Sequence, residues 1–129
     1  MSRPIKFRAW DKRNNRMLLR AAPSVEHGGH HHYNDNGSFR IISEDDSVLM
    51  QFTGLQDKNG KEIFEGDILR LEIILGQITM KIEWDSLRAQ FVYHVINDKE
   101  NFLYPVHGIK NWKIIGNIWD NPELLEGVK

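Results

Sequence analysis

Two carboxylates lie two residues apart in the segment Glu65-Gly66-Asp67. Paired carboxylates carry out general acid–base catalysis when burial drives their pKa values apart, which would make the chain a hydrolase. In the structural alternative, Gly66 permits a tight bend, and Asp67 accepts backbone N–H bonds at the entrance to a strand. The structural interpretation is the simpler one.

Four histidines stand close together in the segment His27-Gly-Gly-His30-His31-His32. Neutral imidazoles bind late transition metals, and the two glycines would let the backbone fold around an ion. A structural or catalytic zinc ion, however, needs three or four ligands that neighbouring groups hold in place, and a surface loop supplies no such support. We therefore predict no metal site and no cofactor. Since the chain has no Cys, thiol chemistry is also excluded.

Nucleophilic and phosphate-binding motifs are missing from the sequence. His94 and His107 could be combined with Ser47 or Ser86 in a hydrolase triad, but no Gly-x-Ser-x-Gly motif presents a serine. No Gly-x-x-x-x-Gly-Lys-Ser/Thr or strand-linked Gly-x-Gly-x-x-Gly motif occurs either. We predict no catalytic residues and expect that the chain is not an enzyme.

Basic and aromatic residues gather in the first twenty positions. If Phe7 and Ala9 face a core, the alternate residues of that strand project together, and cations of the returning strand lie nearby. Cations beside an exposed aromatic ring can bind single-stranded nucleic acid through phosphate attraction and base stacking. In the alternative, the tryptophan packs against another element or subunit and the cations are solvated or paired. The candidate nucleic-acid-binding residues are Lys6, Arg8, Trp10, Arg16 and Arg20.

The charge balance excludes an indiscriminate nucleic-acid binder, because the 129 residues carry a formal net charge of -1. The charge is uneven along the chain. Residues 1–43 hold eight basic and three acidic groups, which gives +5, and residues 44–129 hold nine and fifteen, which gives −6. The first third could therefore attract an acidic partner, or the two parts could attract one another within one chain or between copies.

The elements that must position these groups are short strands. Alternating apolar and polar residues, separated by turn residues such as Asn59-Gly60, predict an all-β, mainly antiparallel fold with a small barrel or sandwich-like body. A Pro after a capping residue at 120–125 predicts one short C-terminal helical turn. The expected strands cover residues 5–10, 16–20, 39–42, 48–53, 68–74, 78–84, 89–96, 102–104 and 112–115.

We expect one domain over residues 1–129, in three parts. An N-terminal hairpin covers 1–20, a variable His- and Gly-rich loop covers 21–38, and the barrel-like body covers 39–129.

No apolar run approaches twenty residues, and the opening segment is too polar for a signal peptide. We therefore expect no membrane association and a cytoplasmic location.

Four long segments follow one another in a recognisable order: Lys6–Asp11, Leu49–Leu55, Asp57–Ile68 and Ile114–Leu125. In these segments the chain resembles the YopX family of proteins. The resemblance spans the chain outside residues 21–40, and Trp119-Asp120 departs mildly from the Tyr-Glu expected there. It implies a small, mostly β protein encoded by phages and prophages, and it implies no known reaction, cofactor or catalytic residue.

These observations predict a phage or prophage accessory protein of the bacterial cytoplasm that acts through protein contacts. Edge strands of a small open barrel invite pairing between copies, so a homo-oligomer is the first expectation. A phage or host protein is a further candidate partner. The alternative function is single-stranded nucleic-acid binding through the N-terminal hairpin.

Overall fold

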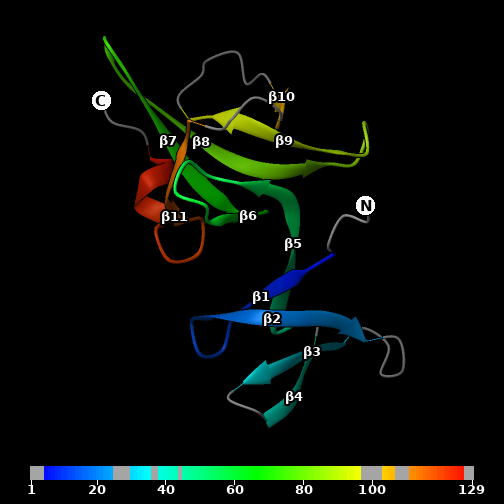
Figure 1. Ribbon diagram of the computed structural model, residues 1–129. Coiled ribbons are helices and arrows are strands. Elements are labelled where there is room, and N and C mark those ends of the chain that lie inside the picture. Colours follow the sequence, from blue (N-terminus) through cyan, green and yellow to red (C-terminus); the bar gives the residue numbers. More distant parts are fainter. Residues whose placement is uncertain are drawn as a thin grey trace. The chain divides into compact units, whose positions relative to one another are not determined.

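A computed structural model describes residues 5–24, 30–35, 38–43, 45–96, 103–106 and 111–126. These residues form eleven β-strands and one short 3-10 helix (Figure 1). Contacts between residues divide the chain into two compact units, Met1–Gly54 and Leu55–Lys129. Each unit is described by itself below.

Five strands build the first unit, in the sheet order β4-β3-β2-β1-β5. β1 pairs with β2 on one side and with β5 on the other, and both pairings are antiparallel. β5 runs past Gly54, so that its last two residues belong to the second unit. The strands are β1 (Phe7–Asp11), β2 (Arg16–Ser24), β3 (His30–Asp35), β4 (Ser38–Ser43) and β5 (Ser47–Gln56).

β1 is buried on both of its faces. Ala9 and Leu18 form a small core with Leu49 and other partly buried residues. On the alternate face of β1, Arg8 is 7% exposed and Trp10 is 6% exposed. Arg8 and Trp10 therefore do not project into solvent, and the burial of Trp10 agrees with the alternative that it packs against another element. Neighbouring strands pair only with the edges of β1, so other side chains of the fold must cover its faces, which an alternating sequence pattern does not reveal.

The prediction of a loop over residues 21–38 is wrong for most of that segment. β2 continues to Ser24, β3 spans His30–Asp35, and β4 begins at Ser38. β3 pairs antiparallel with β4 over six residue pairs, from His30 opposite Ser43 to Asp35 opposite Ser38. Backbone hydrogen bonds hold this ladder, and they do not depend on the apolar alternation from which the loop was inferred.

The second unit holds a five-stranded antiparallel sheet in the order β10-β9-β8-β7-β11, together with β6 and the helical turn η1. Its core cluster consists of Ile63, Leu69, Met80, Ile82 and Trp112, all nearly inaccessible to solvent. The elements are β6 (Glu62–Phe64), β7 (Asp67–Ile73), β8 (Gly76–Asp85), β9 (Gln90–Val95), β10 (Leu103–Pro105), β11 (Lys113–Asn117) and η1 (Pro122–Leu125).

A buried aspartate closes the turn between β5 and β6 and ties that turn to β11. Asp57 Oδ1 accepts the backbone N–H groups of Asn59 and Lys61 at 2.8 and 2.9 Å, and Oδ2 accepts that of Ile114 at 3.0 Å. The turn continues through Gly60, whose φ of 82° is the positive value expected for an Asn-Gly turn. A carboxylate with three such donors is well satisfied, although it is buried.

The same arrangement recurs at two other hairpin turns. Asp11 accepts the N–H groups of Arg13 and Asn14 between β1 and β2. Asp85 accepts the N–H of Leu87 and pairs with Arg88 between β8 and β9. The buried carboxylates of the described turns thus accept backbone N–H groups and hold the turns in shape.

The predicted fold class is confirmed, because the described elements are antiparallel strands, an N-terminal hairpin and a short helical turn near the C-terminal end. The helical turn lies at Pro122–Leu125, within the segment where it was expected. The assignment of the whole chain to one domain stays a prediction.

Replacing Trp10 with Ala should destabilise the protein. The change empties a large buried volume in the first unit, and large-to-small changes of this kind cost about 3–5 kcal/mol. Leu19, on β2, is 74% exposed, and Leu19→Ala is the matched control, with an expected effect within about 0.5 kcal/mol. Urea unfolding followed by circular dichroism measures both, and equal midpoints for the two variants would contradict the burial of Trp10.

The stability of the protein should depend on pH through Asp57. Burial alone would raise the pKa of this carboxyl, but the N–H groups of Ile114, Lys61 and Asn59 bond to it, and together with the Lys61 charge they hold its pKa below the ordinary 3.8. Its contribution to stability is therefore present above pH 3.8 and is lost as the pH falls through the lower folded value.

Asp57→Asn should lower the free energy of unfolding at neutral pH by about 1–3 kcal/mol, because the amide keeps only one acceptor oxygen and its NH2 group cannot accept the bonds made to the other. As the pH falls from neutral through the carboxyl's folded pKa, the variant should also lose less stability than the unmodified protein. Urea midpoints at each pH test this, with Asp45→Asn at an exposed position as the control. Parallel pH profiles for the unmodified protein and Asp57→Asn would exclude the proposed role of the carboxylate.

Candidate functional site

A two-stranded arm extends beyond the rest of the second unit's sheet. β7 and β8 pair from Ile68 opposite Lys81 to Ile73 opposite Gly76. On one side, β11 pairs with β7 only as far as Arg70. On the other side, the paired residues of β9 begin at Met80 on β8. Residues 71–79 therefore form a hairpin beside which the described part of the chain places no strand, although the N–H of Ile96 bonds to the carbonyl of Thr79 at its base. Figure 1 shows this hairpin rising above the sheet.

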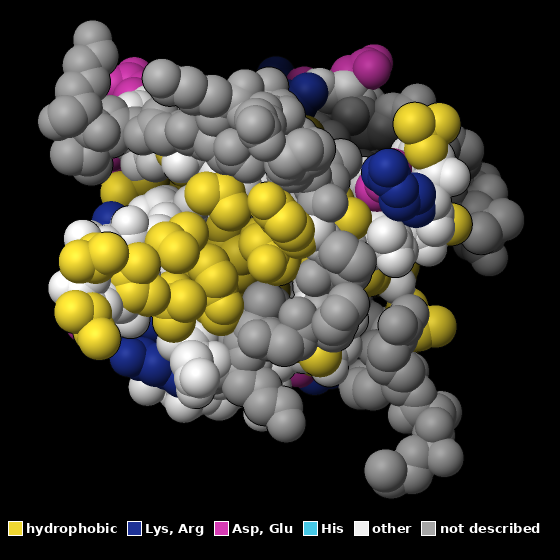
Figure 2. All heavy atoms as spheres, turned by 90° about the horizontal axis from the view of Figure 1, so that it is seen from above, with side chains coloured by type: hydrophobic (Ala, Val, Ile, Leu, Met, Phe, Trp, Pro, Cys, Tyr) yellow, Lys and Arg dark blue, Asp and Glu magenta, His cyan; other side chains and the backbone are white. Residues whose placement is uncertain are grey.

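The end of this arm is apolar and exposed. Ile74 is fully exposed, Leu75 is 94% exposed, and Ile73 is about half exposed. Gly76, with a φ of 140°, makes the turn between the two strands. Figure 2 views the molecule from the side where the arm rises, and it shows a continuous area of hydrophobic side chains on that face. Contiguous apolar areas of this kind commonly mark interaction surfaces.

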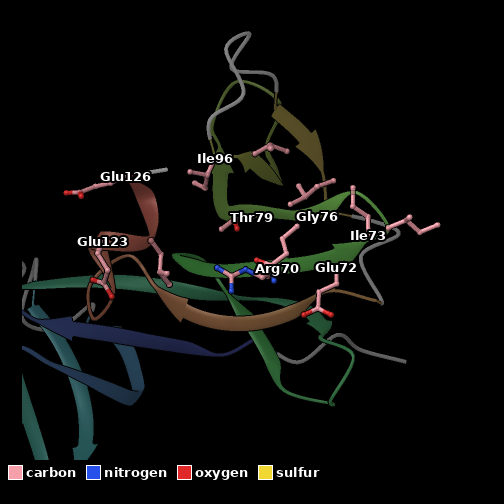
Figure 3. Close-up of a pocket in the computed structure, with 13 residues that line it drawn as sticks. Arg70, Glu72, Ile73, Gly76, Thr79, Ile96, Glu123 and Glu126 are labelled. Carbon is pink, nitrogen blue, oxygen red and sulfur yellow. The ribbon is translucent and has the colours of Figure 1, made fainter. Parts of the chain in front are cut away.

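A groove of about 960 Å³ runs along the arm toward η1 (Figure 3). Apolar side chains of the arm, of β9 and of η1 make up much of its lining, and Arg70 and Thr79 lie between them. Three glutamates line the groove as well, and all three are exposed. Its lining residues are Arg70, Glu72, Ile73, Ile74, Gly76, Gln77, Ile78, Thr79, Val95, Ile96, Glu123, Leu124 and Glu126.

Arg70 is the cation of this groove. It is partly buried, and its Nε atom is inaccessible to solvent and has no hydrogen-bond partner. Among the residues that the structure describes, no carboxylate forms an ion pair with Arg70. Because Nε is inaccessible, an acceptor from outside the chain would bond to the terminal nitrogens of this partly buried guanidinium, and a carboxylate there would also neutralise its charge.

The structure does not bring the five predicted nucleic-acid-binding residues to one exposed surface. Arg8 and Trp10 are buried. Lys6 is exposed and lies over the Phe52 ring, with 5.3 Å between Nζ and the ring centroid. Arg16 Nε lies 3.7 Å from Asp11 Oδ2, and Arg20 is exposed. Nucleic-acid binding itself stays a prediction, but the exposed aromatic platform on which it depended is not formed.

The other residues considered for catalysis lie in strands and turns, as far as the structure describes them. Asp67 is buried, and its Oδ2 accepts the N–H of Phe64 at 2.8 Å, which agrees with its interpretation as a turn residue. The hydroxyl of Ser47 donates to the carbonyl of Ser43 at 3.0 Å. His94 lies on β9 and Ser86 in the turn after β8.

The histidine cluster is described only in part. His30, His31 and His32 lie on β3, and the positions of their side chains are outside the described part of the structure, as are His27 and His107. In the described part of the chain, no three His, Asp or Glu side chains are grouped so as to hold a metal ion. No helix in that part has the length and apolar character needed to cross a membrane.

The apolar arm is the feature that sequence reasoning missed. The predicted strands 68–74 and 78–84 were close to the observed β7 and β8, but the pattern did not show where their neighbours end. One signal was present: Ile73, Ile74 and Leu75 are consecutive apolar residues directly before the turn glycine, where polar residues usually stand.

The comparisons with known proteins agree with the motif segments of the sequence. The family model described as YopX protein matches residues 6–126. Protein EF1440 from Enterococcus faecalis has a crystal structure that superposes on this one with a TM-score of 0.67. The two sequences are 30% identical, and the match covers 96% of this chain and 99% of that chain. Protein yopX from Bacillus subtilis is 19% identical, with a TM-score of 0.60 and coverage of 96% and 98%, which is a likeness of fold.

A search of curated proteins found no match. The family match includes all but a few residues at each end of the chain, and the 30% identical protein aligns with it almost from end to end. On these two findings, the chain belongs to the YopX family.

Proposed function

We propose that this chain is a non-catalytic accessory protein that acts through protein–protein contacts as a homo-oligomer. The family resemblance supports a phage or prophage origin, and a bacterial cytoplasmic location goes with it. The observation that carries the proposal is the exposed apolar tip of the arm of residues 71–79, beside which the described residues place no strand. Leu71 and Ile78 at the base of the arm pack against the core, whereas Ile74 and Leu75 at its tip are exposed. Two-stranded hairpins are marginal in water where nothing packs on them.

The energetic argument favours a covered arm. Burying an exposed Ile or Leu side chain contributes about 1.5–3 kcal/mol. Ile74 and Leu75 are almost entirely exposed, and Ile73 is partly so. In a symmetric dimer each of these gains occurs twice, which offsets a substantial part of the entropy lost on association. The alternative function, single-stranded nucleic-acid binding, has less support because Arg8 and Trp10 are buried.

The unmodified protein should associate at micromolar concentrations, and the double variant Ile74→Ser/Leu75→Ser should associate at least tenfold more weakly. A loss of about 1.4 kcal/mol suffices for a tenfold change in the dissociation constant. Sedimentation velocity over a range of concentrations measures this. The positions are exposed, so circular dichroism should show an unchanged fold.

Leu87→Ser is the matched control for this experiment. Leu87 is 95% exposed at the turn between β8 and β9, and it does not line the groove. Its replacement should leave association unchanged. The proposal of a homo-oligomer is wrong if the unmodified protein stays a monomer throughout the micromolar range.

A further inference from the structure

We infer that the apolar arm of one copy lies in the groove of a second copy, around a two-fold axis near Leu71, and that Arg70 of each copy pairs with Glu72 of the other. The inference rests on the proposed homo-oligomer and specifies which surface forms it. Three observations carry it: the unpaired arm, the continuity of arm and groove, and the charges of Arg70 and Glu72.

Arm and groove are one continuous surface, which is what a two-fold contact needs. Ile73, Ile74 and Ile78 belong to the arm and also line the groove, and Ile96 and Leu124 extend the apolar lining toward η1. In a two-fold interface the same patch of each copy meets its own equivalent. Two arms that lie antiparallel can therefore cover each other's apolar residues, while each tip reaches the η1 end of the other groove.

The spacing of the charges agrees with this arrangement. Arg70 and Glu72 are two residues apart on β7, on the same face of the strand, and about 7 Å separates such positions. Because Arg70 has β8 on one edge and β11 on the other, the two copies meet face to face, through the face that carries Arg70 and Glu72. An axis at residue 71 then places position 70 of one copy opposite position 72 of the other. Each copy then contributes one cation and one carboxylate, so two identical ion pairs flank the axis.

Both partners of this ion pair are available. Arg70 has no ion pair in the described structure, and its Nε is buried without a hydrogen-bond partner. Glu72 is exposed. Figure 3 shows that the Arg70 and Glu72 side chains extend in different directions, so that each can reach another molecule.

The charges of the groove favour a second copy over a free anion. Glu123 and Glu126 also line the groove, and a small anion would meet them without gaining contact with the apolar lining. Both glutamates are exposed, so water and salt screen them more than the partly buried Arg70. The lining of the groove suits an occupant with a carboxylate for Arg70 and apolar side chains beside it. The arm of a second copy has both, because Glu72 stands next to Ile73 and Ile74.

Charge reversal and mixing test the inference. Arg70→Glu alone and Glu72→Arg alone should each associate at least tenfold more weakly than the unmodified protein, because each places like charges opposite one another. Mixed in equal amounts, the two variants should form a one-to-one complex, because one variant then carries carboxylates at both positions and the other carries cations at both. Sedimentation velocity measures association, and a size difference from a fused tag on one variant identifies the mixed complex.

If mixing the two variants restores association, the ion pair forms between copies. A structural defect within one copy would not be repaired by adding a second chain. Lys58→Glu, a similar charge reversal in the turn between β5 and β6, should leave association unchanged. If the single variants associate like the unmodified protein, or if mixing restores nothing, the docking inference is wrong while the homo-oligomer stands. If the unmodified protein never associates, both are wrong.

Hydrogen–deuterium exchange gives a second measurement that needs no substitution at Arg70. Amide exchange at residues 70–79 and 123–126 should slow as the concentration of the unmodified protein rises. Exchange at residues 57–61, in the turn that Asp57 closes, should not change with concentration. Association without protection of the arm and η1 would place the interface elsewhere and overturn the inference.

Discussion

The unequal lengths of the strands in the second unit determine which of its apolar residues are buried. β7 and β8 are longer than the stretches over which β11 and β9 accompany them, so pairing on the outer edges stops at Arg70 and Met80. Up to Arg70 and from Met80 onward, β7 and β8 have a further strand on their outer edges, and the side chains of Leu69, Met80 and Ile82 are inaccessible to solvent. Beyond these points the same two strands continue without a neighbouring strand among the described residues, and the apolar residues at their tip, Ile73, Ile74 and Leu75, are exposed. The core and the exposed arm are therefore two parts of one hairpin.

The ionisable groups fall into two classes with different surroundings. Asp11, Asp57 and Asp85 are buried, accept backbone N–H groups and stabilise turns. Arg70, in contrast, is partly buried and lacks an acceptor for Nε. A satisfied buried carboxylate contributes to the fold and leaves little free capacity for a ligand, whereas an unsatisfied cation in a groove is open to one.

Local sequence patterns predicted most of the strands, because alternation and turn chemistry act over a few residues. The Asn59-Gly60 turn and the helical turn at Pro122 are examples. The segment around His30–Asp35 was missed because its strand is held by backbone pairing with β2 and β4 and not by an apolar pattern. The burial of Trp10 agrees with the packing alternative that the sequence left open, but the sequence could not decide it, because it depends on which tertiary contacts cover that face of β1. For the candidate site, the sequence showed the apolar residues, but the ends of the neighbouring strands depend on tertiary pairing.

The contact between Asp57 and Ile114 has a consequence for how the second unit is assembled during synthesis. The two residues are separated by 57 positions in the chain, and closing a segment of that length costs entropy before the hydrogen bond can offset it. The donors to Asp57 Oδ1, Asn59 and Lys61, are neighbours in the chain, but the donor to Oδ2 belongs to β11, which is synthesised later. The second unit therefore acquires this stabilising bond only after β11 has paired with β7.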